Sequence, residues 1–316
     1  MNDMDDENGA PAPADEHARL KRLATNASVA VGATLAVAKL AAWLLTDSVT
    51  ILSSLLDSIV DVIASLVLFW TVRHALRPPD RSHRYGHGKA EPLGALAQAA
   101  FIGGSGIVLI VQAAGRFINP VPLTATGIGI GVMVCSIAMT FGLVMFQRYV
   151  IRRTGSLAIG ADQLHYAGDL LVNLAVIATL LAYQATGAAW LDSLAAAGIA
   201  GYLLFNAAKI GRGSFDVLMD KELSREDRKR IREIVIGVEG AEGLHDLRTR
   251  SSGTVPFIEL HLEVDGALTV QAAHDIADAV EDALREFYPS AEIILHQEPA
   301  GLDDHRLDRV IAKGRA

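Results

Sequence analysis

Six long apolar blocks dominate the first two thirds of the sequence and decide what it can fold into. A helix needs about 20 mainly apolar residues to cross the hydrocarbon core of a bilayer, and its backbone hydrogen bonds must be satisfied within the segment. The predicted spans are Ala27–Thr46, Val49–Val72, Leu93–Gly115, Leu123–Phe146, Leu164–Thr186 and Ala188–Lys209. The sequence therefore predicts a polytopic α-helical membrane protein with six transmembrane helices.

The distribution of charge predicts the domain boundaries. Residues 1–18 are acidic and poor in apolar side chains, which predicts a disordered tail, and they lack the basic and apolar regions of a signal peptide. Residues 19–212 hold the six spans, and residues 213–300, where charged residues return at ordinary density, form a soluble domain. Residues 301–316 are expected to be a flexible C-terminal tail.

The composition argues against several classes of function. Hydrophobic residues make up 51% of the 316 residues, which is more than a soluble protein of this size usually has. A formal net charge of −8 and the absence of a long basic tract argue against nucleic-acid binding. Because Cys135 is the only cysteine, a metal ion would have to be bound by histidines and carboxylates.

Basic residues mark alternate connections between the spans. They concentrate in segments 73–92 and 147–163 and, before the first span, at Arg19, Lys21 and Arg22, whereas the other connections carry almost none. Loops rich in lysine and arginine stay on the cytoplasmic side of a membrane. Both termini are therefore expected in the cytoplasm.

Two spans carry ionisable residues at helical spacing. Asp57 and Asp61 in the second span, and His165 and Asp169 in the fifth, are each four residues apart, so each pair lies on one face of its helix. Charged groups inside a bilayer are costly and usually functional. Three carboxylates and one imidazole suit a tetrahedral ion such as zinc better than calcium or magnesium. The sequence thus predicts an intramembrane metal site.

A buried lysine partner or a polar helix interface would also account for these carboxylates. Lys39 is the only basic residue inside a predicted span, and it lies close enough to the outer end of the first helix to reach the interface. It is therefore a poor partner for four groups. Asp192, next to Trp190 at the start of the sixth span, is expected at the interface and not as a ligand.

The predicted site also suggests how transport would be driven. Buried carboxylates and imidazoles bind protons when no cation is present and must lose them to bind a metal. Inward proton flow could then drive metal outward, and the sequence contains no nucleotide-binding motif of the Walker type. These features favour a secondary transporter over an ATP-driven pump.

The connection after the second span contains a second group of potential ligands. Asp80, His83 and His87 fall within one short turn, and Gly86 and Gly88 allow a tight backbone there. A second metal site is predicted. A loop of this composition is also compatible with simple solvation or with contact to anionic lipid headgroups.

The soluble domain has the pattern of a small α/β unit in the order αββαβ. The predicted elements are helix 224–238, strands 245–250 and 257–264, helix 269–288 and strand 291–297. Apolar and polar residues alternate along the second strand, which places His261 on the face opposite the core. His245, His274 and His296 fall in the same region, although a surface histidine such as His274 is as often only solvated.

The sequence resembles the cation diffusion facilitator family, specifically its bacterial branch that exports zinc and ferrous iron. The resemblance covers about Leu20 to Pro299 and rests on the two intramembrane pairs, the RYGHGKAE loop, the HDLRTR strand and the terminal HQEP. It implies a proton-coupled exporter of the bacterial inner membrane that works as a homodimer. Zn2+ is expected as the first substrate and as a structural ion, with cadmium and ferrous iron as further substrates and no organic cofactor.

The resemblance also implies roles for single residues. The implied ligands are Asp57, Asp61, His165 and Asp169 in a transport site, Asp80, His83 and His87 in a loop site, and His245, His261, His274, His296, Gln297 and Glu298 in cytosolic sites of a ferredoxin-like domain. The resemblance also implies an ion pair between Lys89 and Asp220, a charge interlock that holds the dimer together at the membrane surface. Glu298 stands where this branch usually has Asp, so its longer side chain changes the geometry of the cytosolic sites.

Two other classes of function are compatible with parts of the sequence. A membrane-anchored metal sensor or binding protein needs only anchoring helices, so four ligands deep in two spans argue against it. An intramembrane metalloenzyme needs a zinc site with an open position and a general base, and the sequence has no HExxH motif. The chain is therefore expected to be a transporter and not an enzyme.

Overall fold

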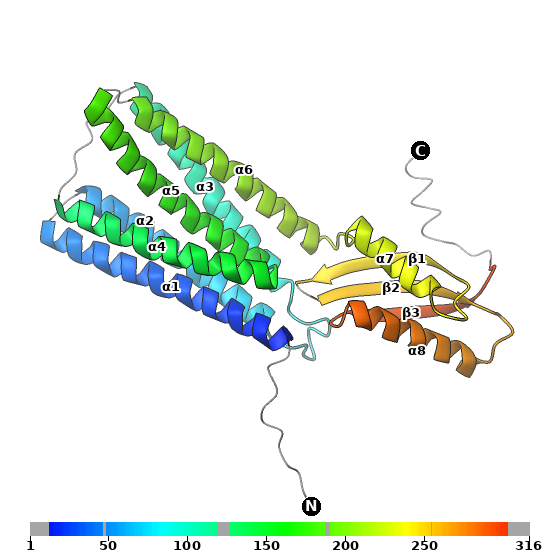
Figure 1. The fold of residues 1–316 in the computed structure, drawn as a ribbon. Coiled ribbons are helices and arrows are strands. Elements are labelled where there is room, and N and C mark those ends of the chain that lie inside the picture. The colour runs from blue at the N-terminus through cyan, green and yellow to red at the C-terminus, as the bar shows by residue number, and fades with distance from the viewer. Residues whose placement is uncertain (1–12, 47–48, 119–126, 187–189, 254, 303–316) are drawn as a thin grey trace, which may run out of the picture. The chain divides into compact units, whose positions relative to one another are not determined.

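The structure is a computed structural model that describes residues 13–46, 49–118, 127–186, 190–253 and 255–302. It divides into two compact units, Met1–Phe215 and Asp216–Ala316. The first is helical and the second combines helices with a sheet (Figure 1). Parts of the predictions lie outside the described residues, namely residues 1–12 and 303–316 of the two predicted tails and the first residues of the fourth and sixth predicted spans.

The helical unit confirms the prediction of six spans. Its helices are α1 (Pro13–Thr46), α2 (Val49–Ala75), α3 (Ala90–Ile118), α4 (Gly127–Thr154), α5 (Leu157–Thr186) and α6 (Trp190–Leu218). Each contains a stretch long and apolar enough to cross a membrane. Since apolar side chains lie on the outside of a membrane protein as well as inside it, the many exposed large hydrophobic residues of these helices fit a lipid environment.

The helices extend beyond the predicted spans. Helix α1 begins at Pro13, so residues 13–18 of the predicted disordered tail are helical, and α6 runs to Leu218, past the predicted boundary at residue 212. The predicted loop 147–163 is wrong: only Gly155 and Ser156 separate α4 from α5. Hydropathy detects the apolar part of a helix, whereas arginine and glutamine are good helix formers that continue it into water. Gly155, with φ of 62°, allows the chain to turn after α4.

Contacts between the helices bring α2 and α5 together. Helix α1 packs on α2 and α4, α4 packs on α5, and α3 packs on both α2 and α5. Gly168 on α5 leaves room for the side chain of Leu203 on α6, because a Cβ at Gly168 would come within 2.7 Å of Leu203 Cδ2. The ionisable residues predicted on α2 and α5 therefore belong to helices that contact each other.

The second unit has the predicted order αββαβ. Its elements are α7 (Arg225–Ile236), β1 (Gly243–Ser252), β2 (Val255–Val264), α8 (Val270–Phe287) and β3 (Glu292–Pro299). Strand β2 is central, antiparallel to β1 and parallel to β3. Both helices begin at a capping side chain: Ser224 accepts from the backbone N–H of Asp227, and Thr269 from that of Ala272.

One face of the sheet carries the core of this unit. Ile258, Leu260 and Leu262 of β2 are buried against Ile231 of α7 and Val280 of α8. The alternation of β2 predicted this face correctly, and it leaves the opposite face to polar side chains. The fold is thus a six-helix membrane domain followed by a ferredoxin-like α+β domain, as predicted.

Candidate metal sites

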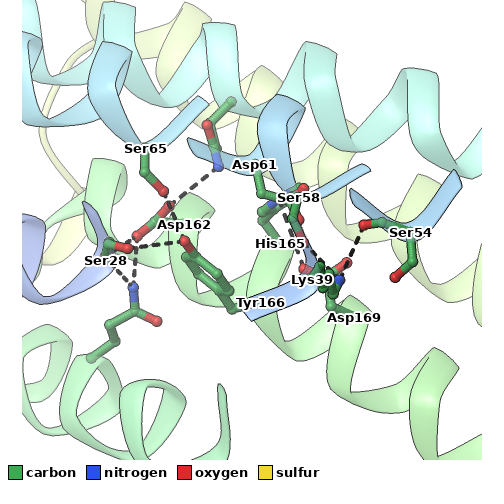
Figure 2. A network of polar contacts seen from close by, with 12 residues as sticks. Ser28, Lys39, Ser54, Ser58, Asp61, Ser65, Asp162, His165, Tyr166 and Asp169 are labelled. Carbon is green, nitrogen blue, oxygen red and sulfur yellow. Dashed lines mark hydrogen bonds and ion pairs between the residues drawn. The ribbon is translucent and has the colours of Figure 1, made fainter. Parts of the chain in front are cut away.

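Helices α2 and α5 bring three of the four predicted transport ligands together. His165 Nε2 lies 2.9 Å from Asp61 Oδ1 and 3.9 Å from Asp169 Oδ2. One ligand atom from each of the three residues lies within 4.8 Å of the other two. Figure 2 shows His165, Asp61 and Asp169 side by side between the helices. Two carboxylates and an imidazole at this spacing can bind one divalent ion.

Asp57 lies beside this cluster and not within it. Its side chain is exposed in the single chain, one helical turn before Asp61. It lines a cavity of about 400 Å³ together with Asp61, His165 and Asp169. The structure therefore places Asp57 at the wall of the space that leads to the other three ligands.

Lys39 does not reach toward the membrane interface as predicted. Its Nζ donates to Ser58 Oγ at 2.6 Å and to the backbone oxygen of Ser54 at 3.2 Å, so it points from α1 into α2 (Figure 2). With Asp61 and Asp169 it lines a cavity of about 150 Å³. Hydroxyl and carbonyl oxygens of α2, with carboxylates nearby, replace water around the ammonium group, which makes the interior position acceptable.

Asp192 has protein partners away from the cluster. It accepts from Arg116 Nη1 and from Thr179 Oγ1, both at 3.1 Å, and its side chain is 14% exposed. Arg116 and Asp192 line a pocket in which none of the predicted ligands takes part. Asp192 is therefore paired with Arg116 and Thr179, apart from the predicted ligands.

Asp162 is a buried carboxylate that the sequence analysis missed. It is fully buried one turn before His165 and accepts from Ser28 Oγ at 2.5 Å, Gln147 Nε2 at 2.7 Å and Gln98 Nε2 at 3.3 Å. These donors are neutral and come from α1, α4 and α3. Figure 2 shows Ser28 and Asp162 next to Tyr166, whose hydroxyl donates to the backbone oxygen of Ser28 at 3.1 Å. The network joins four helices directly beside the proposed metal site.

A buried ion pair, also missed, links α1 to α3. Lys21 Nζ lies 2.7 Å from Glu91 Oε2, and both side chains are almost completely buried. The sequence predicts Lys21 only as a basic residue of the cytoplasmic face. Sequence position alone gave no signal that it has a partner 70 residues away.

The predicted loop residues also come together, between α2 and α3. Asp80 Oδ1 lies 3.4 Å from His83 Nδ1, and Asp80 Oδ2 lies 3.4 Å from His87 Nε2. The backbone N–H groups of His83 and Ser82 donate to Asp80 Oδ1, and these hydrogen bonds hold the pKa of the Asp80 carboxyl below its usual value. Asp80 is therefore kept ionised, as a metal ligand must be.

In the second unit, three histidines form a row across the sheet. His245 of β1 pairs with His261 of β2, which pairs with His296 of β3. Glu298 lies beside all three, at 2.6 Å from His261 Nδ1, 3.3 Å from His245 Nε2 and 3.3 Å from His296 Nε2. Glu263 contacts His245 Nδ1 at 2.9 Å. His245, His261 and Glu298 are close enough to bind one ion.

Two predicted cytosolic ligands lie elsewhere. Gln297 pairs with Leu262, which faces the core, so its side chain points to the opposite face of the sheet from His296 and Glu298. Because adjacent residues of a strand alternate in direction, Gln297 lies apart from this cluster, and its role as a cytosolic ligand stays a prediction. His274 is exposed on α8, with Nε2 3.5 Å from Asp278, and its role as a ligand stays a prediction.

The structure has the features of a membrane transporter for divalent cations. Its helices are long and apolar enough to cross a bilayer, and carboxylates and an imidazole line a cavity between them. Further histidine clusters lie outside the spans. The chain belongs to the cation efflux family, also called the cation diffusion facilitators. Residues 26–219 match the cation efflux transmembrane domain, and residues 223–300 match the cytoplasmic domain of cation efflux proteins.

Similar proteins cover nearly the whole chain. The cation-efflux pump FieF of Pectobacterium carotovorum subsp. carotovorum is 44% identical over 283 residues, which are 90% of this chain and 94% of that protein. FieF of Pectobacterium atrosepticum is 45% identical over the same shares of both chains. FieF of Escherichia coli K12 is 41% identical over 291 residues, 90% of this chain and 95% of that protein.

Proposed function

We propose that the protein exports divalent transition metal ions from the cytoplasm in exchange for protons, with zinc as the first substrate and cadmium and ferrous iron as further ones. The observation that carries this proposal is the cluster of Asp61, His165 and Asp169 in a membrane cavity. An imidazole with carboxylates is a ligand set that suits zinc. The similarity to cation-efflux pumps supports the direction of transport.

The contact between His165 and Asp61 supports exchange with protons. A hydrogen bond of 2.9 Å between Nε2 and a carboxylate oxygen requires one proton between these two atoms. A metal ion that binds Nε2 and the carboxylate must displace this proton, because the ligand lone pairs cannot serve both. Binding of metal and binding of protons therefore exclude each other at this contact.

The proposed arrangement in the cell follows from charge and from the second domain. The basic residues near α1, after α2 and around the α4–α5 turn favour both termini in the cytoplasm. The similarity to cation-efflux pumps supports a location in the inner membrane. We expect a homodimer, supported by the match to the family's cytoplasmic domain. Lys89 and Asp220 belong to different units, and their interlock at the dimer is part of this proposal.

A direct test uses inside-out proteoliposomes, in which export from the cytoplasm becomes zinc uptake. Wild-type protein should take up zinc when an outward-directed proton gradient is imposed, and Asp61→Ala should lose this uptake. Asp275→Ala, which changes an exposed carboxylate on α8, is the matched control and should transport normally. Equal or absent uptake in wild type and Asp61→Ala with zinc, cadmium, iron and manganese would contradict the proposal.

The second candidate function is a membrane-anchored metal sensor or binding protein. The cluster of His245, His261 and Glu298 favours it, since a soluble domain can report metal without transport. Loss of this domain would abolish a sensor, whereas it would slow a transporter whose transport site remains in the membrane domain. The vesicle assay therefore distinguishes the two functions.

A further inference from the structure

His74 lies in the last turn of α2, directly against the predicted loop site. Its ring stacks on Trp70, with centroids 5.2 Å apart, and its other neighbour is the ring of His87, whose centroid is 4.7 Å away. His74 Nδ1 is buried and has no hydrogen-bond partner among the described residues. A buried imidazole nitrogen without a hydrogen-bond partner is energetically unfavourable, so we expect this atom to bind a ligand.

His87 is the ring that His74 contacts. Its Nε2 faces Asp80, so this is the nitrogen with which His87 would bind an ion shared with Asp80. Two histidine rings neighbour His87, with His83 at a centroid distance of 4.6 Å and His74 at 4.7 Å. With Zn–N bonds of about 2.0 Å and tetrahedral angles, two imidazoles that bind one zinc ion have centres about 5 Å apart. Both neighbour distances are close to this value.

We propose that His74 is a fourth protein ligand of the loop site, in addition to Asp80, His83 and His87. This inference rests on the proposed binding of metal by the loop. Three protein ligands would leave one position of a tetrahedral zinc ion to water, whereas four close the coordination sphere, which is the pattern of ions that hold a structure in place. The fourth ligand comes from a membrane helix and not from the loop.

A closed site of this kind ties the loop to the helix that carries Asp61. His74 lies 13 residues after Asp61, which is about 20 Å along the same helix. His87 lies three residues before α3 begins at Ala90. An ion bound to both histidines joins the end of α2 to the start of α3. Occupation of the loop site therefore restrains the position of a helix that carries transport ligands.

The first test is histidine modification of the full-length wild-type protein with diethyl pyrocarbonate, read residue by residue by mass spectrometry. Zinc should slow the modification of His74 together with His83 and His87, and leave the modification of His17 on α1 unchanged. Protection of His83 and His87 without His74 overturns the inference. If none of the three is protected, the loop site and the inference both fail, while transport through Asp61 remains open to the vesicle assay.

The second test separates metal binding from ring packing. His74→Phe keeps an aromatic ring against Trp70 but removes both nitrogens, and His17→Phe is the matched control. If His74 is a ligand, His74→Phe weakens the loop's affinity for zinc by at least about tenfold, measured as the zinc concentration that protects His83 from modification. Unchanged protection of His83 in His74→Phe shows that the ring only packs, and contradicts the inference.

Discussion

His165 Nε2 and Asp61 Oδ1 meet at 2.9 Å across the interface of α5 and α2. The contact joins the two helices that carry the proposed transport ligands, and it lies at the wall of a cavity of about 400 Å³. A cation that enters must break this hydrogen bond and take its place between the helices. Metal binding is therefore coupled to the separation of two specific groups, which gives each ligand a role that can be tested.

The ligands should contribute unequally to binding. We expect Asp169→Asn to weaken equilibrium zinc binding by at least about tenfold and Asp57→Asn to weaken it less, because Asp169 lies in the cluster and Asp57 lies at the cavity wall. Competition with a chromophoric chelator in detergent measures this affinity. Asp192→Asn, outside the cavity, is the control and should bind zinc as wild type does. A larger loss in Asp57→Asn than in Asp169→Asn would contradict this order of contributions.

The Asp162 network should stabilise the helix bundle. Asp162→Ala removes an acceptor from Ser28, Gln98 and Gln147. Ser28 keeps the backbone oxygen of Ala24 and Gln147 keeps Ser28 Oγ, so Gln98 loses most, and a buried donor left without a partner costs about 1–3 kcal/mol. Asp162→Asn retains one acceptor oxygen and should lose less. Thermal unfolding of the detergent-solubilised protein can be monitored by size-exclusion chromatography. The melting temperature should be highest for wild type, lower for Asp162→Asn and lowest for Asp162→Ala. Equal melting temperatures for all three would show that the network does not stabilise the bundle.

The sequence predicted the candidate metal ligands of α2 and α5 because polar groups are conspicuous in an apolar helix. Spacing of four residues placed His165 and Asp169 on one face, and the structure brings both to Asp61. In the same way, alternation along β2 predicted that His261 faces away from the core. Both patterns are local and repeat with the period of one element, so they can be recognised without knowing the fold.

Features that depend on contacts between distant segments could not be predicted in this way. Asp162 lies in segment 147–163, whose arginines predict a loop, and the position of Lys39 near the helix end predicts only that its side chain reaches the interface. His74 lies just beyond the predicted second span, which ended at Val72. In each case the decisive partner belongs to another helix or to the following loop, and no periodicity within one element reports it.

Alkaline pH should act on the second domain through Tyr288. Its hydroxyl donates to Asp227 Oδ1 at 3.1 Å, and burial together with this hydrogen bond raises the pKa of the Tyr288 phenol. Because the folded pKa lies above the unfolded value of about 10, the neutral phenol stabilises the domain below that pH, and the contribution is lost as pH rises through the folded pKa. When tyrosinate absorbance is followed as pH rises, the wild-type protein should show a step above the usual tyrosine pKa, and this step should be absent in Tyr288→Phe. If the variant keeps the whole titration curve, the assignment to Tyr288 is wrong.

Metal binding by the cytosolic cluster should depend on Glu298 far more than on His274. The carboxylate of Glu298 lies within 3.3 Å of a ring nitrogen of each of His245, His261 and His296. His274 lies on α8 with Asp278 as its neighbour. Glu298→Ala should therefore lower the zinc affinity of this domain by at least about tenfold, whereas His274→Ala should have a milder effect.

Zinc-dependent protection of His245 and His261 from diethyl pyrocarbonate measures occupation of this cluster in the full-length protein. Glu298→Asp is the informative intermediate, because it keeps the charge and shortens the side chain by one methylene. Glu298 contacts His261 at 2.6 Å and His245, on the strand beyond, at 3.3 Å. An aspartate at this position is too short to keep both contacts. We therefore expect Glu298→Asp to lie between wild type and Glu298→Ala. If the zinc affinity of His274→Ala falls as far as that of Glu298→Ala, this expectation is wrong. His274 would then belong to the site, contributed by a second copy of the chain.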